Sequence, residues 1–421
     1  MMPDRTILYI APQIPYPLTA GMVIRQYHLL ASYARVGRVR LVAFYRHQSE
    51  LEAVDALKPL CASCHLVPAD TMYGEAERAN RPRWRRRVEE AVTLKPRGAQ
   101  LEFSREMQRV VSEIAPDADI LHVARLQMVP YIAALTRKKS PAQRFVLDID
   151  DIETVRKRRM LQSFLIESQQ RRALEYYDFC KLWLYQRRAL RWFDRVFVCS
   201  ARDREYVGNG KAVVIPNGAT VPPAVLPDES DGRTLLYVGT LSYWPNVDGL
   251  LYFLRQIFPL IRLEVPHARL LIVGKDPPPD IAALHDGKTV CVEGNVPSVE
   301  KYYRQATVSI VPLRVGGGTR LKILEAFAVG RPVISTGVGS EGLDVVNGEH
   351  LLVGDDPVSF ARSCITLLND PSLRSSLVAR GRDLVEQRYT WESVEGRVER
   401  MAHDLLGEPH VSRMQAHEGN G

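Results

Sequence analysis

The chain has 421 residues, of which 46% are hydrophobic and 25% charged, and this composition is that of a folded globular protein with two to three domains. Six cysteines are too few for a disulfide-built scaffold, and no run of 18 apolar residues predicts a membrane-spanning helix. The first apolar run is too short and too interrupted by proline for a signal peptide, so we expect a cytoplasmic protein.

The net charge of +7 is distributed unevenly. Residues 1–217 contain 36 basic and 24 acidic residues, whereas the remainder contains 20 and 25. Two basic clusters, RPRWRRRVEE (residues 81–90) and RKRRMLQSF (residues 156–164), suit nucleic acid, an anionic membrane or a phosphorylated ligand, and equally a solvated helix face. Since no helix-turn-helix, RRM or zinc-finger signature is present, we expect no nucleic-acid partner.

Short apolar runs rich in Val, Ile and Leu alternate with helix-length segments along the whole chain. In order they are TILYIA, VRLVAF, CHLVP, DILHVA, RFVLDID, RVFVCS, AVVIP, TLLYVG, ARLLIVG, TVCVEG, TVSIVP, PVIST and HLLVG. Near-continuous apolar strands of this kind predict parallel sheets in an α/β fold. Two Rossmann-like domains are simpler than a single sheet of thirteen strands.

The boundary between the two domains is predicted in PNGATVPPAVLPDESDG, residues 216–232, which is dense in proline and acidic residues. We therefore expect an N-terminal domain at residues 1–217 and a C-terminal domain at 218–390. An amphipathic helix follows at 391–407, and the polar tail at 408–421 is expected to be disordered.

Three motifs are weaker than they first look. GVGSEG (residues 337–342) matches a dinucleotide fingerprint but leaves no room for the required helix. CASCH (residues 61–65) lacks a second ligand pair for zinc and an exported context for haem, which favours core cysteines. LDIDD could hold Mg²⁺, but we favour helix capping or contact with an acceptor through Asp150 and Asp151, so no metal is expected.

The strongest candidate site is VPLRVGGGTRLKILEAF, in which a strand ends at Leu313 and a helical pattern begins near Thr319. The intervening glycines at residues 316–318 allow close approach of the backbone. The helix start offers free N–H groups and the positive end of a dipole, and this arrangement suits a phosphate or diphosphate.

Two cations in the first turn of this helix, Arg320 and Lys322, oppose the helix dipole unless an anion binds there. Glu325, about one turn later, could reach a sugar or ribose hydroxyl. The alternative is a plain turn between a strand and a helix with surface charges.

The first half offers a similar strand end. Gly21 precedes a helix that carries Arg25, and His122 ends another strand on the same edge of the predicted sheet. Open α/β sheets bind ligands at the carboxyl ends of their strands. A lone histidine at a strand end is, however, more often structural.

These residues resemble the GT-B glycosyltransferases, specifically glycosyltransferase family 4. The similarity is most specific in LLYVGTLSYWPNVDGLLYF, ARLLIVGK, VCVEGNVPSVEKYYRQATVSIVPL and GGGTRLKILEAFAVGRPVIST, and PLTAGMVIR, DILHVA and IPNGAT extend it to the first half. The resemblance implies two Rossmann domains facing each other across a cleft, with a last helix crossing back to the first. It also implies a nucleotide-sugar donor, retention of anomeric configuration, and no metal or other cofactor.

The resemblance assigns roles to the residues that match the family's motifs. Glu325 matches the second Glu of the E-x7-E motif, which binds ribose hydroxyls. The first Glu, which contacts the donor sugar in the family, falls on Gly317. The usual Arg and Lys after Gly239 are absent, since Thr240 follows it and Asn246 lies near the Lys position.

Arg320 and Lys322 would replace these two cations as catalytic diphosphate ligands in a GGGTRLK variant of the loop. Gly21 and Thr319 would join them at the donor, and His122 would approach the donor sugar or the acceptor. Arg25 would lie on the acceptor side with Asp150 and Asp151.

The predicted function is transfer of a sugar from a UDP- or GDP-sugar to a glycan or lipid-linked acceptor in polysaccharide or glycolipid assembly. The basic clusters suggest a peripheral position on the inner membrane face. Two alternatives stay open: an inactive or regulatory GT-B-like protein, prompted by Gly317, and a soluble natural-product glycosyltransferase.

Overall fold

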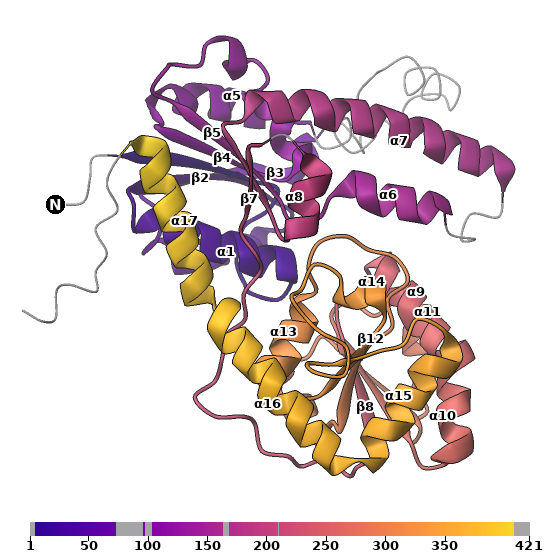
Figure 1. Ribbon diagram of the computed structural model, residues 1–421. Helices are drawn as coiled ribbons and strands as arrows, with labels where there is room; N and C mark the ends of the chain where they lie inside the picture. Colours follow the sequence, from indigo (N-terminus) through magenta and orange to yellow (C-terminus); the bar gives the residue numbers. More distant parts are fainter. Residues whose placement is uncertain (1–4, 73–95, 97–102, 163–167, 209, 408–421) are drawn as a thin grey trace, which may run out of the picture.

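The computed structural model describes residues 5–72, 96, 103–162, 168–208 and 210–407, and these form two α/β domains (Figure 1). The basic cluster predicted at residues 81–90 and the predicted tail at 408–421 lie outside the described residues. Within the described part of the chain, no helix is both long and apolar enough to cross a membrane.

The first domain is built on a seven-stranded sheet in the order β3-β2-β1-β4-β5-β6-β7, with every neighbouring pair parallel. Each of the first seven apolar runs forms one of its strands. They are β1 (Thr6–Ala11), β2 (Arg38–Tyr45), β3 (Ser63–Pro68), β4 (Ile120–Ala124), β5 (Arg144–Ile149), β6 (Arg195–Val198) and β7 (Ala212–Val214).

The second domain has a six-stranded parallel sheet in the order β10-β9-β8-β11-β12-β13. Its strands coincide with the last six apolar runs. They are β8 (Thr234–Val238), β9 (Arg269–Gly274), β10 (Val290–Gly294), β11 (Val308–Val311), β12 (Val333–Ser335) and β13 (Leu352–Val353). The predicted fold class, α/β with two Rossmann-like parallel sheets, is confirmed.

Helices cover both faces of the first sheet, because successive strand residues point to opposite sides and both sets are apolar. Leu8 and Ile10 pack with α5 (Arg105–Ile114) and α7 (Gln169–Ala189). Ile7 and Tyr9 pack on the other side with α1 (Gly21–Ala34) and α17 (Trp391–Leu406). Among the described residues, this domain has two further α-helices, α6 (Glu153–Gln162) and α8 (Ala201–Val207).

The second sheet is covered in the same way. One face packs against α9 (Trp244–Tyr252), α10 (Phe258–Glu264) and α15 (Pro357–Asn369). The other face packs against α12 (Glu300–Gln305), α13 (Leu321–Ala328) and α16 (Pro371–Arg388). Two one-turn helices, α11 (Pro279–Ala282) and α14 (Gly337–Ser340), follow β9 and β12, and a single π turn (Phe253–Ile257) joins α9 to α10.

The chain crosses between the domains twice. After the second domain is complete, α17 returns to the first and packs along α1 (Figure 1). The ring of Trp391 stacks 4.0 Å from that of His28. The segment that leads from the first domain to the second lies beside this return, since the amide of Ala219 donates to the carbonyl of Tyr389 at 2.7 Å. A Cβ on Gly218 would lie 2.7 Å from the Trp391 ring, so glycine permits the two crossings to touch.

Candidate active site

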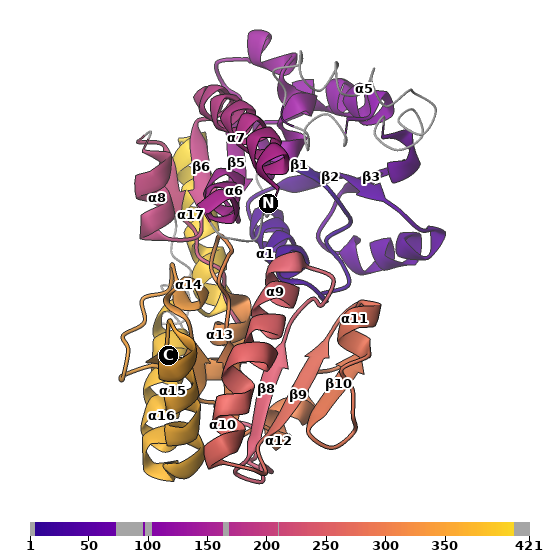
Figure 2. The same ribbon diagram turned by 90° about the vertical axis from the view of Figure 1, so that its right-hand side faces the viewer.

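A cleft of about 750 Å³ separates the domains. Because the carboxyl ends of parallel strands share one edge of a sheet, the loops that follow them gather there, and the two edges face each other (Figure 2). The first domain contributes the loops after β1, β4 and β5, and the second those after β8, β9, β10 and β11. The predicted residues that line the cleft are Gly21, Asp150, Asp151, Gly239, Gly316, Gly317, Thr319, Arg320, Lys322 and Glu325.

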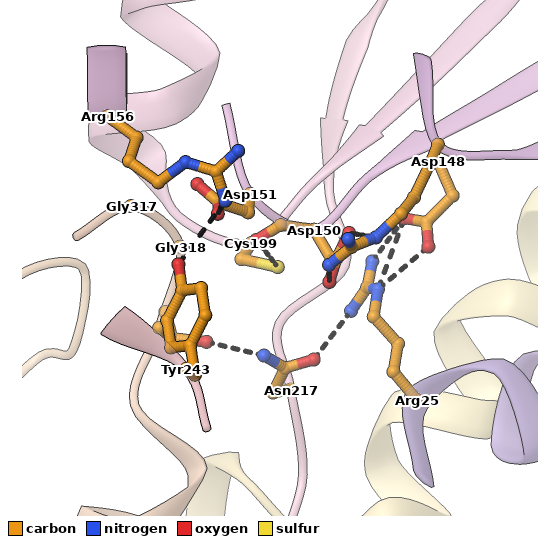
Figure 3. A network of polar contacts seen from close by, with 12 residues as sticks. Arg25, Asp148, Asp150, Asp151, Arg156, Cys199, Asn217, Tyr243, Gly317 and Gly318 are labelled. Atoms are coloured by element: carbon orange, nitrogen blue, oxygen red, sulfur yellow. Dashed lines mark hydrogen bonds and ion pairs between the residues drawn. The ribbon is translucent and has the colours of Figure 1, made fainter. Parts of the chain in front are cut away.

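The glycine loop, residues 316–318, follows β11 and meets the first domain directly. A Cβ on Gly317 would overlap the Oδ1 atom of Asp151, and one on Gly318 would overlap the backbone carbonyl oxygen of Asp150 (Figure 3). Gly318 also has a φ of 65°, which favours glycine. Glycine is therefore required here because the two domains approach each other so closely.

Arg320 lies immediately before α13, which begins at Leu321 rather than near Thr319. Its Nη1 atom donates to the backbone carbonyls of Gly317 and Gly318. Its Nε and Nη2 atoms are buried and have no hydrogen-bond partner among the described residues. Burial lowers the pKa of Arg320, but a guanidinium stays charged in proteins. The cleft thus contains a buried positive charge with two donor atoms unused.

Lys322 extends from the first turn of α13 to the turn after β8. Its Nζ atom donates to the hydroxyl of Tyr237 and to Oδ1 of Asn246, each at 3.2 Å, and lies 4.4 Å from the centre of the Tyr237 ring. A Cβ on Gly239 would be only 2.7 Å from this nitrogen. Burial and the charge of Arg320 lower the pKa of Lys322 to about 7. Its ammonium therefore occupies the space beside Asn246, where the resemblance places the missing family lysine.

Glu325 lies one turn further along α13 and lines the same cleft. Burial raises the pKa of its carboxyl, and the nearby ammonium of Lys322 opposes this effect. The two side chains thus influence each other electrostatically, while the ammonium of Lys322 donates to Tyr237 and Asn246.

Arg25 is not on the acceptor side, and that prediction is corrected. Its guanidinium is 1% exposed, pairs with Asp148 at 2.7 Å, and donates to Oδ1 of Asn217 at 3.1 Å. The amide of Asn217 donates in turn to the hydroxyl of Thr319 at 2.9 Å (Figure 3). The side chain of Arg25 points into the first domain because it pairs with the buried carboxylate of Asp148. It therefore supports Asn217 at the domain boundary and does not line the cleft.

The two predicted acceptor-side aspartates do line the cleft, but each is paired. Asp150 accepts from Nε and Nη2 of Arg125 at 2.9 and 2.7 Å, and Asp151 accepts from Arg156 at 2.8 Å. Within the described ranges, no group of three or more His, Cys, Asp or Glu side chains is arranged to hold a metal.

His122 is not brought to the cleft. The strand β4 continues past it to Ala124, and its side chain is fully buried between α1 and the sheet. The ring stacks 4.4 Å from Tyr9, and Nδ1 lies 3.1 Å from the hydroxyl of Tyr33. Burial lowers the pKa of His122 to about 3, so the ring is neutral. This placement favours the structural interpretation of His122 and gives no support to contact with donor or acceptor.

Three of the four residues in the described basic cluster, residues 156–159, form ion pairs. Arg156 pairs with Asp151, Lys157 with Glu175, and Arg159 with Glu341. Among its residues, Arg158 is the exposed one. The hypothesis that this cluster forms a membrane surface therefore loses its basis.

Sequence reasoning missed two cleft residues. Arg125 directly follows β4 with a φ of 75°, unusual for a residue other than glycine, and the only signal for it was its place just after the DILHVA run. Tyr243, just before α9, is joined to the first domain by Arg156, which donates to its hydroxyl at 3.3 Å.

Two parallel-sheet domains that present their strand ends to a shared cleft define the GT-B architecture of glycosyltransferases. Residues 232–370 match the family described as glycosyl transferases group 1, so the resemblance predicted from the sequence is confirmed. That GGGTRLK is a variant of the family's phosphate loop stays a prediction.

Solved structures share the fold over nearly the whole chain. Sucrose-phosphate synthase from Thermosynechococcus elongatus is 16% identical with a TM-score of 0.67, over 96% of this chain and 100% of that one. HepE from Anabaena, in complex with UDP and glucose, is 12% identical with a TM-score of 0.62, over 94% and 98%. The pneumococcal O-GlcNAc transferase GtfA, in complex with UDP and GlcNAc, is 12% identical with a TM-score of 0.62, over 96% and 100%.

Two curated proteins are similar over shorter stretches. The phosphatidyl-myo-inositol mannosyltransferase of Mycolicibacterium smegmatis is 28% identical over 207 residues, 47% of this chain and 53% of that protein. An uncharacterized 44.6 kDa protein in the cps region of Klebsiella pneumoniae is 26% identical over 168 residues, 38% of this chain and 43% of that protein. The chain spans about half the length of the curated relatives that it matches.

Proposed function

We propose that the protein transfers a sugar from a nucleotide diphosphate sugar to an acceptor hydroxyl. The observation that carries this proposal is the buried guanidinium of Arg320, whose Nε and Nη2 atoms lie at the cleft without a partner among the described residues. A diphosphate supplies the charge and the acceptor oxygens that these atoms lack. Lys322 adds a second cation, and Glu325, which lines the same cleft, would accept hydrogen bonds from ribose hydroxyls.

The reaction breaks the bond between the anomeric carbon and the diphosphate, and negative charge develops on the leaving oxygen. Arg320, Lys322 and the free N–H groups at the start of α13 would stabilise that charge, with each preorganised donor contributing about 3–4 kcal/mol in the transition state. In a retaining reaction the departing phosphate itself takes the proton of the acceptor, so no separate base, metal or other cofactor is required. His122, neutral and away from the cleft, is not proposed as a base.

The donor is proposed to be UDP- or GDP-linked, and solved structures of the same fold hold UDP or UDP-glucose. Calorimetric titration of the protein with UDP, GDP and ADP tests this proposal. We expect UDP or GDP to bind with a Kd in the micromolar range and ADP to bind at least tenfold more weakly. If none of the three binds, the proposal fails and the inactive GT-B-like alternative is favoured. Turnover of a nucleotide sugar would exclude that alternative.

The acceptor is proposed to be a glycan or a lipid-linked sugar in polysaccharide or glycolipid assembly. A relative named as a phosphatidyl-myo-inositol mannosyltransferase and another from a cps region support this class. A small soluble natural product is the alternative, and transfer to a lipid-linked rather than a soluble acceptor would distinguish the two.

A lipid-linked acceptor places the enzyme at the inner face of a membrane, and α7 offers a suitable surface. Tyr176 and Trp183, which lie two turns apart on one side of the helix, are exposed by 60% and 42%. Four arginines on the same helix are also exposed: Arg171, Arg172, Arg187 and Arg188. The two acidic residues of α7 are partly buried and contact Lys157. Exposed aromatic side chains with arginines suit anionic headgroups, so we propose the side of α7 that carries Tyr176, Trp183 and Arg187 as the membrane-facing surface.

A further inference from the structure

The carboxylate of Asp151 enters the cleft where a side chain on Gly317 would begin. Asp151 follows β5 of the first domain, and its side chain is 12% exposed. Its Oδ1 atom is buried and has no hydrogen-bond partner among the described residues, and a Cβ on Gly317 would overlap this atom. Both residues line the cleft. The space of the missing glutamate side chain is thus entered by a carboxylate from the opposite domain.

The orientation of this carboxylate is fixed by a clamp across the domain boundary. Oδ2 of Asp151 accepts from Nη1 of Arg156 at 2.8 Å, and the same nitrogen donates to the hydroxyl of Tyr243 at 3.3 Å (Figure 3). Tyr243 belongs to the second domain. One oxygen of Asp151 is therefore held by the clamp, and the other faces the glycine loop.

The unused oxygen accepts hydrogen bonds but cannot donate them, because an ionised carboxylate carries no hydrogen. A buried acceptor without a partner is unfavourable until a donor arrives, and sugar hydroxyls are suitable donors. Arg320 lies beside the same loop with its own unused donor atoms. Arg320 would bind a diphosphate, and the neighbouring carboxylate of Asp151 would accept hydrogen bonds from the hydroxyl groups of an attached sugar.

We propose that Asp151 recognises the transferred sugar by accepting hydrogen bonds from its hydroxyl groups. It would thereby take the role that the family resemblance gives to the glutamate replaced here by Gly317. This inference rests on the proposed function. Because Asp151 and Gly317 belong to different domains, the sugar is recognised only when the domains are together as in this structure.

Asp151→Asn tests the inference because it keeps the shape of the side chain and removes its charge. Calorimetry would compare UDP with UDP-glucose, UDP-galactose and UDP-N-acetylglucosamine, and GDP with GDP-mannose. In the unaltered protein, we expect one sugar to increase affinity over its parent nucleotide. In the variant, we expect that increase to fall about 10-fold or more, as for a hydrogen bond to a charged group, while the affinity for the nucleotide alone changes less than about 2-fold.

A second test transfers the carboxylate from position 151 in the first domain to position 317 in the second. Once Asp151 becomes glycine, the nearest remaining atom to a Cβ on Gly317 is the backbone nitrogen of Ile152 at 3.6 Å, an ordinary contact. Gly317 does not have a positive φ, so its backbone tolerates a side chain. We expect Asp151→Gly to lose the sugar-dependent affinity and the double variant Asp151→Gly with Gly317→Asp to regain part of it.

Two controls separate sugar recognition from a structural effect. Arg156→Gln breaks the clamp but keeps the carboxylate, and Asp117→Asn removes an exposed carboxylate at the opposite edge of the sheet. We expect Arg156→Gln to lose part of the sugar-dependent affinity, because the carboxylate is no longer held in place. If Asp117→Asn reproduces the full loss, or if Asp151→Asn keeps the sugar-dependent affinity, the inference is overturned while nucleotide binding stands. If no sugar increases affinity in the unaltered protein, the inference also fails. If the unaltered protein binds no nucleotide at all, the proposed function itself is overturned.

Discussion

Asn217 and Thr319 join the two domains through a hydrogen bond of 2.9 Å between the side-chain amide of the first and the hydroxyl of the second. Asn217 also accepts from Arg25, whose guanidinium pairs with Asp148. Thr319, two residues before α13, is thus connected to a buried ion pair in the first domain. Substitutions that break the Arg25–Asp148 pair should therefore lower the stability of the protein and disturb the cleft.

Replacing Arg25 with methionine should destabilise the protein strongly. The change leaves the carboxylate of Asp148 buried without its ion-pair partner, and breaking a buried pair in this way costs about 3–5 kcal/mol. Urea denaturation followed by circular dichroism measures the effect. Arg35→Met, at the C-terminal cap of the same helix, is the control, because its side chain is 49% exposed and exposed pairs contribute about 0–1 kcal/mol. Equal losses in the two variants would contradict the importance of the buried pair.

Replacing Arg320 with alanine should lower turnover of the nucleotide sugar by about 100-fold or more, as expected for loss of a preorganised donor. Lys322→Ala should have an effect of the same order. Arg314→Ala, in the same loop but 39% exposed and paired with Asp248, is the control and should change turnover less than about 2-fold. Near-normal rates in both cleft variants would refute the assigned diphosphate site.

Nucleotide affinity should fall as pH rises through 7, because the pKa of Lys322 is lowered to about 7 and only the protonated amine attracts a diphosphate. Binding near pH 7.5 should therefore be accompanied by proton uptake, as the ligand raises this pKa. Titration calorimetry in buffers of different ionisation enthalpy measures the uptake. Lys322→Arg keeps its charge throughout this range, so it should show a flatter pH profile. The same uptake in that variant would assign the proton to another group.

Vesicles containing phosphatidylglycerol should bind the protein at low salt, and neutral phosphatidylcholine vesicles should not. The arginines of α7 would contribute about 1 kcal/mol each near an anionic surface. The double variant Trp183→Ala with Arg187→Glu should release most of the protein in a sedimentation assay. Arg380→Glu on the second domain, at a site 56% exposed, is the control and should have little effect. No sedimentation of the unaltered protein would refute the proposed membrane surface.

The sequence predicted the strands well because their residues are apolar on both faces, a pattern that does not depend on distant contacts. The glycine loop was also predictable, since three glycines between a strand and a helix are a local signal. The start of α13 was predicted near Thr319, two residues before its observed start at Leu321, which is usual for helix boundaries.

What the sequence could not predict depends on contacts between distant residues. His122 looked like the end of a strand because nothing local marks the two further residues of β4. Arg25 was predicted on the acceptor side, but its guanidinium pairs with a carboxylate 123 residues away in the sequence. Asp151 meets Gly317 only because two separately folded domains come together, and no local pattern records that encounter.

The hydrogen bond between Ala219 and Tyr389 holds the two connections between the domains side by side. Were the domains to rotate relative to each other, these two touching connections would act as a hinge strap. Each swing away from the strap would lift Asp151 off Gly317 and loosen the sugar position, and each return would rebuild it. The same rotation would then both admit the substrate and restore the contact that selects its sugar.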